Sequence, residues 1–517
     1  MTPFDTIAVP TFHEVIERHA RERPRAPALR FQGRIWTYEA MDRRANRVAH
    51  ALLRDGLVPG DRILFVGRNS DAVALLALAG SKAGITLVPL NWRLAPAEMQ
   101  ALAEDSGAKL IFAAPDHVDR AAGFAGAMPL LSTDAVTGDG DWLADDETPP
   151  PIPPDPYAVL VQVYTSGATG LPKGVMLMHR SLLGINALRH LVPWDGWGPD
   201  DVTLVSAPLG HVGAFGMLAR ALFFGGEAVI QETFDPGTTL GAIERLGISK
   251  LALVPTAIRM VLDHPRARDV DYGRIDTIIY GSAPISLELL REAVAVFGCR
   301  FAQSYGCSET SGPTVALPPD DHDPDGNPRM TSAGLPLPGA EIKIIGPDGD
   351  ALPSGAVGEI CIRSVATMKG YWNRPEETAR VLGPDGWLRT GDAGLIDADG
   401  YLHVRARIKE MIVSGAENVY PAEVEAAIAG HPAVADVAVI GVPDPHWGEA
   451  VKAIVVARPG AVLAPASVIA WVRARIAGYK VPKSIDVVPM LPLNSAGKID
   501  KRALRAPYWE GHDREVN

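Results

Sequence analysis

Apolar and polar residues alternate along the chain in patterns that predict helices and short buried strands in turn. Within residues 37–56, apolar side chains recur at three- and four-residue spacing, which predicts a helix; they are Met41, Ala45, Val48, Ala49, Leu52 and Leu53. The segments that follow predict a buried strand at residues 62–66, a second helix at 72–84 and another apolar run at 85–89. This alternation is typical of layered α/β folds with parallel strands.

Two breaks interrupt the pattern. Residues 132–156 are acidic and then proline-rich, which predicts a surface connector before a buried strand at 157–164. The second break lies near residues 405–410. Beyond it the sequence predicts alternating strand residues at Val437 and Val439, a turn at 441–444, a strand at 450–457 and a helix near 465–477. We therefore expect an N-terminal domain of residues 1–406 and a separate α+β domain of residues 407–517.

Composition narrows the class of protein. Of 517 residues, 47% are hydrophobic and 21% charged, which excludes a mainly disordered chain. The formal charge of −12 argues against nucleic-acid binding as the main role, because that depends on basic surfaces. The three cysteines form no C-x-x-C pair, so a disulfide framework and a thiolate zinc site are not expected. They fit a reducing compartment, and we expect the cytoplasm.

The sequence also bears on membranes and on assembly. The first thirty residues show no secretory leader, and the apolar run at 72–80 is shorter than the ~18 residues that a membrane helix needs. We expect no transmembrane segment; peripheral membrane contact and a homodimer stay open.

The strongest chemical signal is a glycine-rich segment directly after the strand predicted at 157–164. It combines backbone freedom, hydroxyl donors and one ammonium group in Thr165, Ser166, Gly167, Thr169, Gly170, Lys173 and Gly174. Glycines let backbone N–H groups converge on an anion, so the segment predicts a phosphate-binding loop. Its glycine and lysine spacing differs from G-x-x-x-x-G-K-[ST]. A glycine turn without a ligand is the plain alternative.

Five further segments follow in order at residues 281–284, 303–310, 386–392, 407–421 and 493–498. With the loop at 164–174, they make the chain resemble the acyl-adenylate-forming superfamily, in particular its acyl-CoA synthetase and fatty-acid–CoA ligase branch. The resemblance covers nearly the whole chain. It implies a large N-terminal domain of layered α/β sheets with a β-barrel-like portion, and a small mobile C-terminal α+β domain.

The resemblance implies an activity as well. In this superfamily a carboxylic acid and Mg-ATP form an acyl-adenylate and pyrophosphate, and a thiol, usually coenzyme A, then displaces AMP. The chain is thus expected to be an ATP-dependent acid–CoA ligase that uses ATP, Mg²⁺ and coenzyme A. Two alternatives of other classes are an ATP hydrolase or phosphotransferase, which would release ADP, and a catalytically inactive nucleotide-binding protein. The inactive protein would lack Lys498 or Glu309, and both are present.

The resemblance assigns residues to the nucleotide. The ATP and AMP contacts that it implies are Thr165, Ser166, Gly167, Ala168, Thr169, Gly170, Lys173, Gly281, Ser282, Ala283, Ser304, Tyr305, Gly306, Cys307, Ser308, Asp392, Arg407 and Lys498. Asp392 would accept from the ribose hydroxyls, as a carboxylate can from both. Thr165 and Glu309 are the implied Mg²⁺ ligands, since oxygen ligands suit that cation.

The implied catalytic residues are Lys498, His211, Thr165 and Glu309. By resemblance, Lys498 reaches from the small domain into the active site during adenylation. The small domain then rotates about a hinge at Lys409, withdraws Lys498 and presents a face for coenzyme A, formed by Ser414, Gly415, Ala416 and Glu417. A mobile group delivered in one state fits such a gating role.

The acid is expected to be apolar. The segment Pro208–Gly216 has no acidic side chain that could pair with an amino group, which disfavours amino acids. The implied acyl pocket holds His211, Val212, Phe215, Ile279 and Ala302, with Ala214, Ile278 and Cys307 beside them, and Phe215 would be a gate or wall. We expect a fatty acid, with an aryl or alicyclic acid as the alternative.

Three residues depart from the superfamily's usual pattern. Ala168 replaces a threonine of the phosphate loop, and Ala416 stands where a second glycine is common. Gly210 replaces an aromatic residue and is expected to widen the region beside His211.

Overall fold

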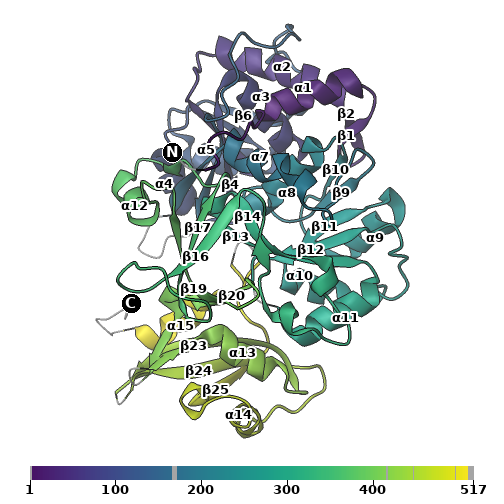
Figure 1. The fold of residues 1–517 in the computed structure, drawn as a ribbon. Helices are drawn as coiled ribbons and strands as arrows, with labels where there is room; N and C mark the ends of the chain where they lie inside the picture. Colours follow the sequence, from purple (N-terminus) through teal and green to yellow (C-terminus); the bar gives the residue numbers. More distant parts are fainter. Residues whose placement is uncertain are drawn as a thin grey trace.

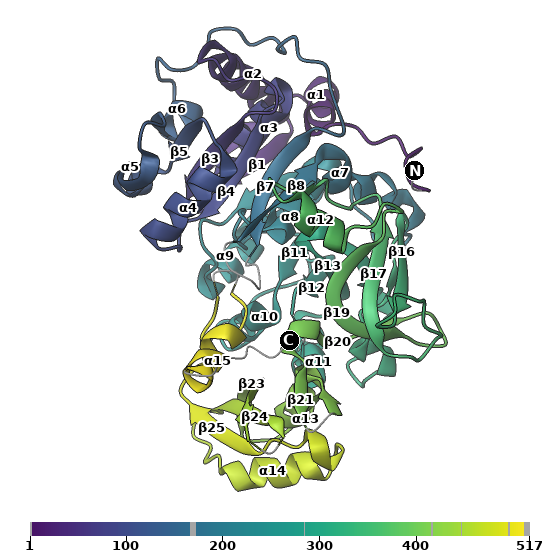
Figure 2. The ribbon, with the colours of Figure 1, turned by 90° about the vertical axis from the view of Figure 1, so that its left-hand side faces the viewer.

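The computed structural model describes residues 3–165, 172–283, 285–414, 417–445, 447–494 and 497–510, and for Lys409, Glu417 and Asn418 the backbone alone. Three sheets and their helices build a large N-terminal part, and a fourth sheet builds a smaller C-terminal unit at one end of it (Figures 1 and 2). This confirms the expected α/β class with a small α+β unit. The boundary expected after residue 406 falls one residue before the last strand of the large part ends, and it stays a prediction.

The first sheet has seven strands. Their order is β18 (Gly370–Tyr371), β8 (Lys173–Met178), β7 (Val159–Thr165), β4 (Thr86–Asn91), β3 (Arg62–Gly67), β5 (Leu110–Ala113) and β6 (Leu130–Ser132). Strands β3 to β7 are parallel, and β8 returns antiparallel to β7. The helices of this region are α2 (Tyr38–Arg54), α3 (Asp71–Ala83), α4 (Pro96–Ser106), α5 (Val118–Ala125) and α6 (Asp134–Thr137). They include both helices predicted from apolar spacing.

The second sheet has nine strands. Their order is β15 (Leu335–Pro336), β14 (Gly312–Leu317), β13 (Arg300–Cys307), β12 (Thr277–Gly281), β11 (Lys250–Leu253), β9 (Val202–Val205), β10 (Glu227–Ile230), β1 (Pro27–Phe31) and β2 (Arg34–Thr37). Its helices are α1 (Phe12–Glu22), α7 (His179–Ala187), α8 (Val212–Phe223), α9 (Pro236–Leu246), α10 (Pro255–Leu262) and α11 (Leu287–Phe297). The main hydrophobic core takes residues from both sheets and from the fully buried α3.

The large part contains a third sheet, which has four antiparallel strands. Its order is β16 (Ala340–Ile345), β17 (Gly358–Ser364), β19 (Leu388–Ile396) and β20 (Leu402–Arg407), and α12 (Pro375–Val381) precedes β19. Strand β19 overlaps the sequence segment 386–392 and contains Asp392, which contacts Tyr305 of β13. Among the described residues, no helix has the length and apolar character needed to cross a membrane.

The C-terminal unit folds around its own core. Its elements are β21 (Ile412–Ser414), β22 (Glu417–Val419), α13 (Pro421–Ala429), β23 (Val434–Asp444), β24 (Gly448–Ala457), α14 (Pro465–Arg473), β25 (Ser484–Val488) and α15 (Lys501–Trp509). The turn predicted at 441–444 is wrong, because β23 continues to Asp444 and pairs with β24. Pro443 fits there since β23 is an edge strand, where a missing N–H costs no ladder bond.

The connector expected at 132–156 is only partly irregular. The segment begins at the end of β6 and contains α6, and Val136 and Leu143 are buried in the main core. Arginines of α2 also bind it: Arg47 donates to the Ala144 carbonyl at 2.7 Å and Arg43 pairs with Glu147 at 2.5 Å. The connector therefore packs along α2 instead of crossing the surface unattached.

Candidate active site

A buried carboxylate, Asp392, sits between two partners at the ends of β13 and β20. The Tyr305 hydroxyl donates to Asp392 Oδ2 at 2.7 Å, and Arg407 Nε lies 2.9 Å from Asp392 Oδ1. The arginine reaches the carboxylate because Asp392 and Arg407 are directly opposite in the antiparallel pair β19–β20. Each carboxylate oxygen keeps a second acceptor position, so Asp392 is oriented and can still accept two more hydrogen bonds.

Charge at this carboxylate is balanced by its neighbours. Burial raises the pKa of Asp392, while the charge of Arg407 and the hydrogen bond from Tyr305 oppose that rise. Burial and the adjacent carboxylate raise the pKa of Tyr305, which keeps its hydroxyl protonated as a donor. The three side chains thus form one coupled unit.

Lys498 comes from the C-terminal unit and lies within electrostatic reach of this cluster. Burial lowers the pKa of Lys498, Arg407 lowers it further, and the Asp392 carboxylate opposes both. The preceding residue is held to the large part, because the Thr256 hydroxyl of α10 donates to the Gly497 carbonyl at 3.0 Å. The segment that carries Lys498 is therefore in contact with the large part in the described state.

Lys501, at the start of α15, fixes the base of the segment that carries Lys498. Its ammonium lies 2.7 Å from Glu425 of α13 and 3.6 Å from Glu410 in the hinge segment. The two carboxylates raise the pKa of Lys501 against the effect of burial. One lysine thereby ties the hinge segment, α13 and the C-terminal helix together.

Glu309 and Lys173 both contact Tyr371 of β18. The Tyr371 hydroxyl donates to Glu309 Oε1 at 2.8 Å, and the Lys173 ammonium lies 4.9 Å from the centre of the Tyr371 ring. Lys173 is also ion-paired with Glu377 of α12, which lowers the pKa of that carboxyl. In this state the lysine of the predicted phosphate loop is thus neutralised by a protein carboxylate.

The donor set suits a magnesium ion only in part. Thr165 ends β7 and pairs with Lys173 at the start of β8, and Glu309 supplies one carboxylate. Among the described residues, no group of three or more His, Cys, Asp or Glu side chains could hold a metal by itself. Mg²⁺ usually takes one or two carboxylates and completes its shell with water and substrate phosphates. A hydroxyl and a carboxylate beside a phosphate loop fit that pattern.

Close backbone packing shapes the turn after β12. A Cβ on Gly281 would lie 2.2 Å from the Ser304 carbonyl oxygen, so β12 and β13 require glycine there. Ser282 has a φ of 66°, in the region that non-glycine residues seldom adopt. Ala283 is half-buried next to it, and Gly306 packs against the Gly312 backbone, where a Cβ would lie 2.0 Å from the carbonyl oxygen. Ser304, Cys307 and Ser308 are half-buried along the same edge.

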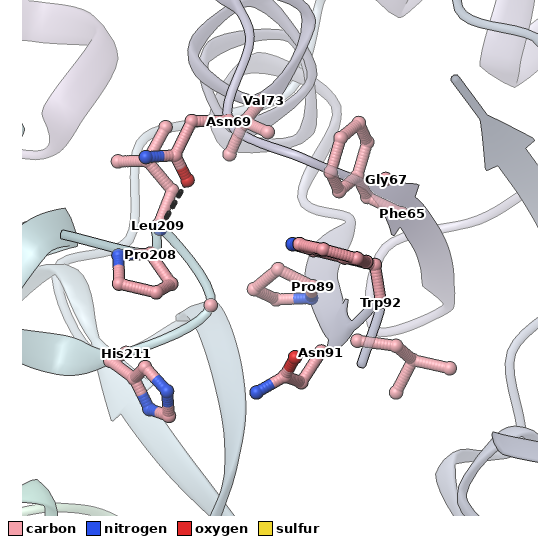
Figure 3. A pocket seen from close by; sticks show the side chains of 12 residues that line it. Phe65, Gly67, Asn69, Val73, Pro89, Asn91, Trp92, Pro208, Leu209 and His211 are labelled. Atoms are coloured by element: carbon pink, nitrogen blue, oxygen red, sulfur yellow. Dashed lines mark hydrogen bonds between the residues drawn. The ribbon is translucent and has the colours of Figure 1, made fainter. Parts of the chain in front are cut away.

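His211 immediately precedes α8 and lines a small pocket against the end of β4. Figure 3 shows His211 on one side of this pocket and Asn91 and Trp92 on the other. The Leu209 N–H donates to Asn69 Oδ1 at 2.7 Å, which anchors the loop before the helix (Figure 3).

The residues of the expected acyl pocket differ in how deeply they are buried. Val212 and Ile279 are half-buried against the main core, and Ala214 and Ala302 are buried. Phe215 is fully buried in that core, so it can form a wall but not a mobile gate.

One expectation for this region is wrong. Ile278 belongs to the core on the opposite face of the sheet from Ile279, because successive strand residues point to opposite faces. Gly210 lines the small pocket beside His211, and that it widens this region stays a prediction. A Cβ on Gly210 would lie 3.3 Å from the Pro89 carbonyl oxygen, so this glycine also lets the loop pack closely on β4.

Several expected site residues lie outside the described residues. These are Ser166, Gly167, Ala168, Thr169 and Gly170 of the phosphate loop, Gly415 and Ala416 on the expected coenzyme A face, and the side chains of Lys409 and Glu417. Ser414 is buried and pairs with Gly448 at the edge of the C-terminal sheet.

Sequence reasoning missed Tyr371, Glu377 and Lys501. Tyr371 reaches Glu309 only because β18 pairs with β8, and Glu377 reaches Lys173 through the same pairing. A strand of only two residues is too short to be predicted from the local sequence pattern. Lys501 stands three residues beyond Lys498, and its acidic partners come from other elements.

Comparison with known proteins gives consistent results along the whole chain. The sequence model of the AMP-binding enzyme matches residues 16–372, and that of the AMP-binding enzyme C-terminal domain matches residues 423–498. A fatty acid–[acyl-carrier-protein] ligase, ScoC of Streptomyces coeruleorubidus, is 39% identical, with 96% of each chain covered. A feruloyl-CoA synthase of Amycolatopsis sp is 40% identical over 95% of this chain and 98% of its own. The ATP-bound crystal structure of MatB from Rhodopseudomonas palustris is 31% identical and superposes with a TM-score of 0.87, covering 96% of this chain and 99% of that one.

The first prediction concerns Asp392. Replacing it in Asp392→Ala removes the acceptor that Tyr305 and Arg407 orient, so ATP should bind at least about tenfold more weakly, as expected when a charge-assisted hydrogen bond is lost. Tyr305→Phe should weaken binding by less, because Arg407 still holds the carboxylate. Titration calorimetry with ATP measures both, and Asp399→Ala, on an exposed turn, is the matched control. An unchanged ATP affinity in Asp392→Ala would remove this residue from the nucleotide site.

The second prediction concerns the ion pair that holds Lys173. Glu377→Gln should release the ammonium and so tighten ATP binding by about two- to fivefold, which is the scale of a half-exposed ion pair. Glu376→Gln, on the neighbouring and more exposed side chain, should leave the affinity unchanged. The same titration with ATP measures both variants. Weaker ATP binding in Glu377→Gln would show that the Glu377 carboxylate supports the predicted phosphate loop instead of competing with the nucleotide.

Proposed function

The chain belongs to the AMP-binding enzyme family, and on that basis we propose that it is an AMP-forming acyl-CoA synthetase. The observation that carries this proposal is the convergence of Lys498, from the C-terminal unit, on the cluster of Asp392, Arg407 and Tyr305. A carboxylate and an α-phosphate repel each other, and an ammonium placed between them is the charge that an adenylation step needs.

The first half-reaction joins the acid to the nucleotide. A carboxylate oxygen of the acid forms a bond to the α-phosphorus of ATP, and the bond to the bridging oxygen of pyrophosphate breaks. Asp392 accepts from the ribose hydroxyls, and Lys498 stabilises the negative charge that gathers between acid and phosphate. Fixing both reactants in this geometry removes much of the entropic barrier.

Mg²⁺, held by Glu309 and Thr165 together with phosphate oxygens, would neutralise charge on the departing pyrophosphate. Tyr371 positions Glu309 through its hydrogen bond. Lys173 becomes available to the phosphates once it leaves Glu377, so ATP and the protein carboxylate compete for one ammonium.

In the second half-reaction, the sulfur of a thiol attacks the acyl carbonyl and AMP leaves. Coenzyme A is the proposed thiol, which the similarity to a feruloyl-CoA synthase supports. The segment with Ser414, Gly415, Ala416 and Glu417 is the proposed face for it, reached by rotation about Lys409. The similarity to ScoC keeps an acyl-carrier protein as the alternative acceptor.

The proposed acid is apolar, with a fatty acid first and an aryl acid second. Ile279, Ala302 and Val212 supply hydrophobic walls. The first turns of α8 leave room as well, because a Cβ on Gly213 or Gly216 would meet no atom within 4 Å. That room and the feruloyl-CoA synthase relative favour a broad aryl acid as the second candidate. The cytoplasm is the proposed location, since all three cysteines are free thiols.

A product analysis tests the proposed activity. The chain, incubated with Mg-ATP, should release AMP and pyrophosphate with an apolar acid, octanoate or ferulate, and full turnover should require coenzyme A. Anion-exchange chromatography separates AMP from ADP, and reactions without acid are the control. Release of ADP and phosphate would contradict adenylation. If the acyl group were transferred to an acyl-carrier protein and not to coenzyme A, the adenylation step would stand and only the proposed acceptor would be wrong.

The lowered pKa of Lys498 predicts a pH dependence. Lysine acts as an ammonium below its pKa, so adenylation should fall as pH rises through a value below that of an ordinary lysine. Arg407→Gln removes a charge that lowers this pKa, and the alkaline limb should then move to higher pH. Lys498→Arg is the matched control, because its guanidinium does not titrate in this range and the limb should vanish. If activity still falls at alkaline pH in Lys498→Arg, the fall is due to the titration of another group and not of Lys498.

A further inference from the structure

A second cleft lies away from the candidate active site, at the opposite end of the seven-stranded sheet. It opens where β3, β4 and β7 begin, whereas Thr165 and the phosphate loop lie where β7 ends. Its volume is about 530 Å³, within the range of small-molecule sites. Ile152, Pro153, Met176 and Trp372 supply apolar surface, and Arg62, His179 and Lys369 supply nitrogen donors.

Arg62 is the most informative of these residues, because its charge is buried among neutral partners. The residue is 7% exposed. Its Nε donates to Gln162 Oε1 at 2.9 Å and its Nη1 to the Gly60 carbonyl at 3.1 Å. Within the part of the chain that the structure describes, no carboxylate forms an ion pair with it. The guanidinium lies 3.2 Å from the centre of the Trp372 ring, and burial lowers its pKa.

A buried guanidinium without an ion-paired carboxylate is costly. The charge of Asp61 offsets part of that cost from further away, and an anion in the cleft would offset more of it. His179 adds a neutral donor: its Nδ1 accepts from the Phe12 N–H at 3.1 Å, so its proton is on Nε2, and burial lowers its pKa to about 3. Lys369 places a second cation at the rim, 3.4 Å from the Tyr157 carbonyl oxygen. The lining also includes one acid, Asp155, which accepts from the Tyr157 N–H at 2.8 Å.

We propose that this cleft is a second ligand site, which binds a small organic anion: a carboxylate or phosphate group carried on an apolar body. The anionic group pairs with Arg62 and Lys369, and the apolar body packs on Met176, Ile152 and Trp372. The site is separate from the nucleotide and acid sites, and it does not depend on the activity proposed above.

A chain of polar contacts connects this cleft to the phosphate loop. Gln162, which binds Arg62, donates to the Tyr164 hydroxyl at 3.2 Å, and that hydroxyl donates to Asp105 Oδ2 at 2.7 Å. The other oxygen of Asp105 accepts from Arg374 at 2.9 Å. Arg374 Nε lies 3.6 Å from Glu377, the carboxylate that holds Lys173. These contacts join Arg62 to Lys173 of the predicted phosphate loop.

Fluorescence titration with 8-anilinonaphthalene-1-sulfonate, an apolar anion, tests the site on the full chain. We expect a saturable site in the unaltered protein and in Asp392→Ala, whose change lies at the nucleotide site. Arg62→Gln should weaken probe binding at least about tenfold, as the loss of a charge-assisted contact would. Ala158→Trp should abolish it by filling the cleft, which Ala158 lines, while leaving ATP affinity unchanged. Circular dichroism and the unfolding temperature establish that each variant folds.

Competition identifies the anionic group. Displacement of the probe by octanoate assigns a carboxylate, and displacement by inorganic phosphate assigns a phosphate. If Arg62→Gln does not fold, Lys369→Glu replaces it as the charge variant and should weaken the probe by about threefold or more. Probe binding that is equal in the unaltered protein, the charge variant and Ala158→Trp overturns the proposal. Binding that neither octanoate nor phosphate displaces overturns it as well.

Discussion

The candidate active site depends on a buried carboxylate that three charged or polar groups share. Asp392 lies between the Tyr305 hydroxyl and the Arg407 guanidinium, with Lys498 within reach of its charge. Without Arg407 and Tyr305, burial would raise the pKa of Asp392 further, and without Asp392 the Lys498 ammonium would lose its proton more easily. The charge on Lys498, in the C-terminal unit, therefore depends on a carboxylate of the large part. The electrostatics of the site thus couple catalysis to the placement of the C-terminal unit.

The contacts between the large part and the C-terminal unit therefore affect the site as well as the stability of the fold. The Thr256–Gly497 hydrogen bond joins the segment that carries Lys498 to the large part. The ion pairs of Lys501 tie the same segment to α13 and to Glu410, beside the predicted hinge. Such contacts cost little to break, in contrast to a large hydrophobic interface. A unit attached in this way suits an enzyme in which one lysine has to enter for the first half-reaction and leave before the second. The Lys173–Glu377 ion pair is a similar weak contact. We expect the Lys173 ammonium to leave Glu377 and bind the phosphates of ATP instead.

The sequence predicts the α/β class well, because that class depends on local patterns, whereas the position of the nucleotide site stays a prediction. Apolar spacing predicted α2 and α3, and the glycine-rich segment lies directly after β7. Features that depend on sheet pairing could not be predicted. Ile278 and Ile279 look alike in sequence, yet they face different cores, and Tyr371 reaches Glu309 only through the short strand β18. Pro443 suggests a turn until the edge position of β23 is known.

Lys498 is proposed to be essential for adenylation and dispensable for thioester formation, so the most direct test separates the two half-reactions in Lys498→Ala. Pyrophosphate release in a single turnover measures adenylation, and thioester formation is measured with supplied acyl-AMP and coenzyme A. We expect adenylation to fall by about a hundredfold or more, which is the scale for removing a group that stabilises transition-state charge, while thioester formation changes by less than about threefold. An equal loss in both half-reactions would overturn the proposed role, because Lys498 would then support the fold or both steps alike.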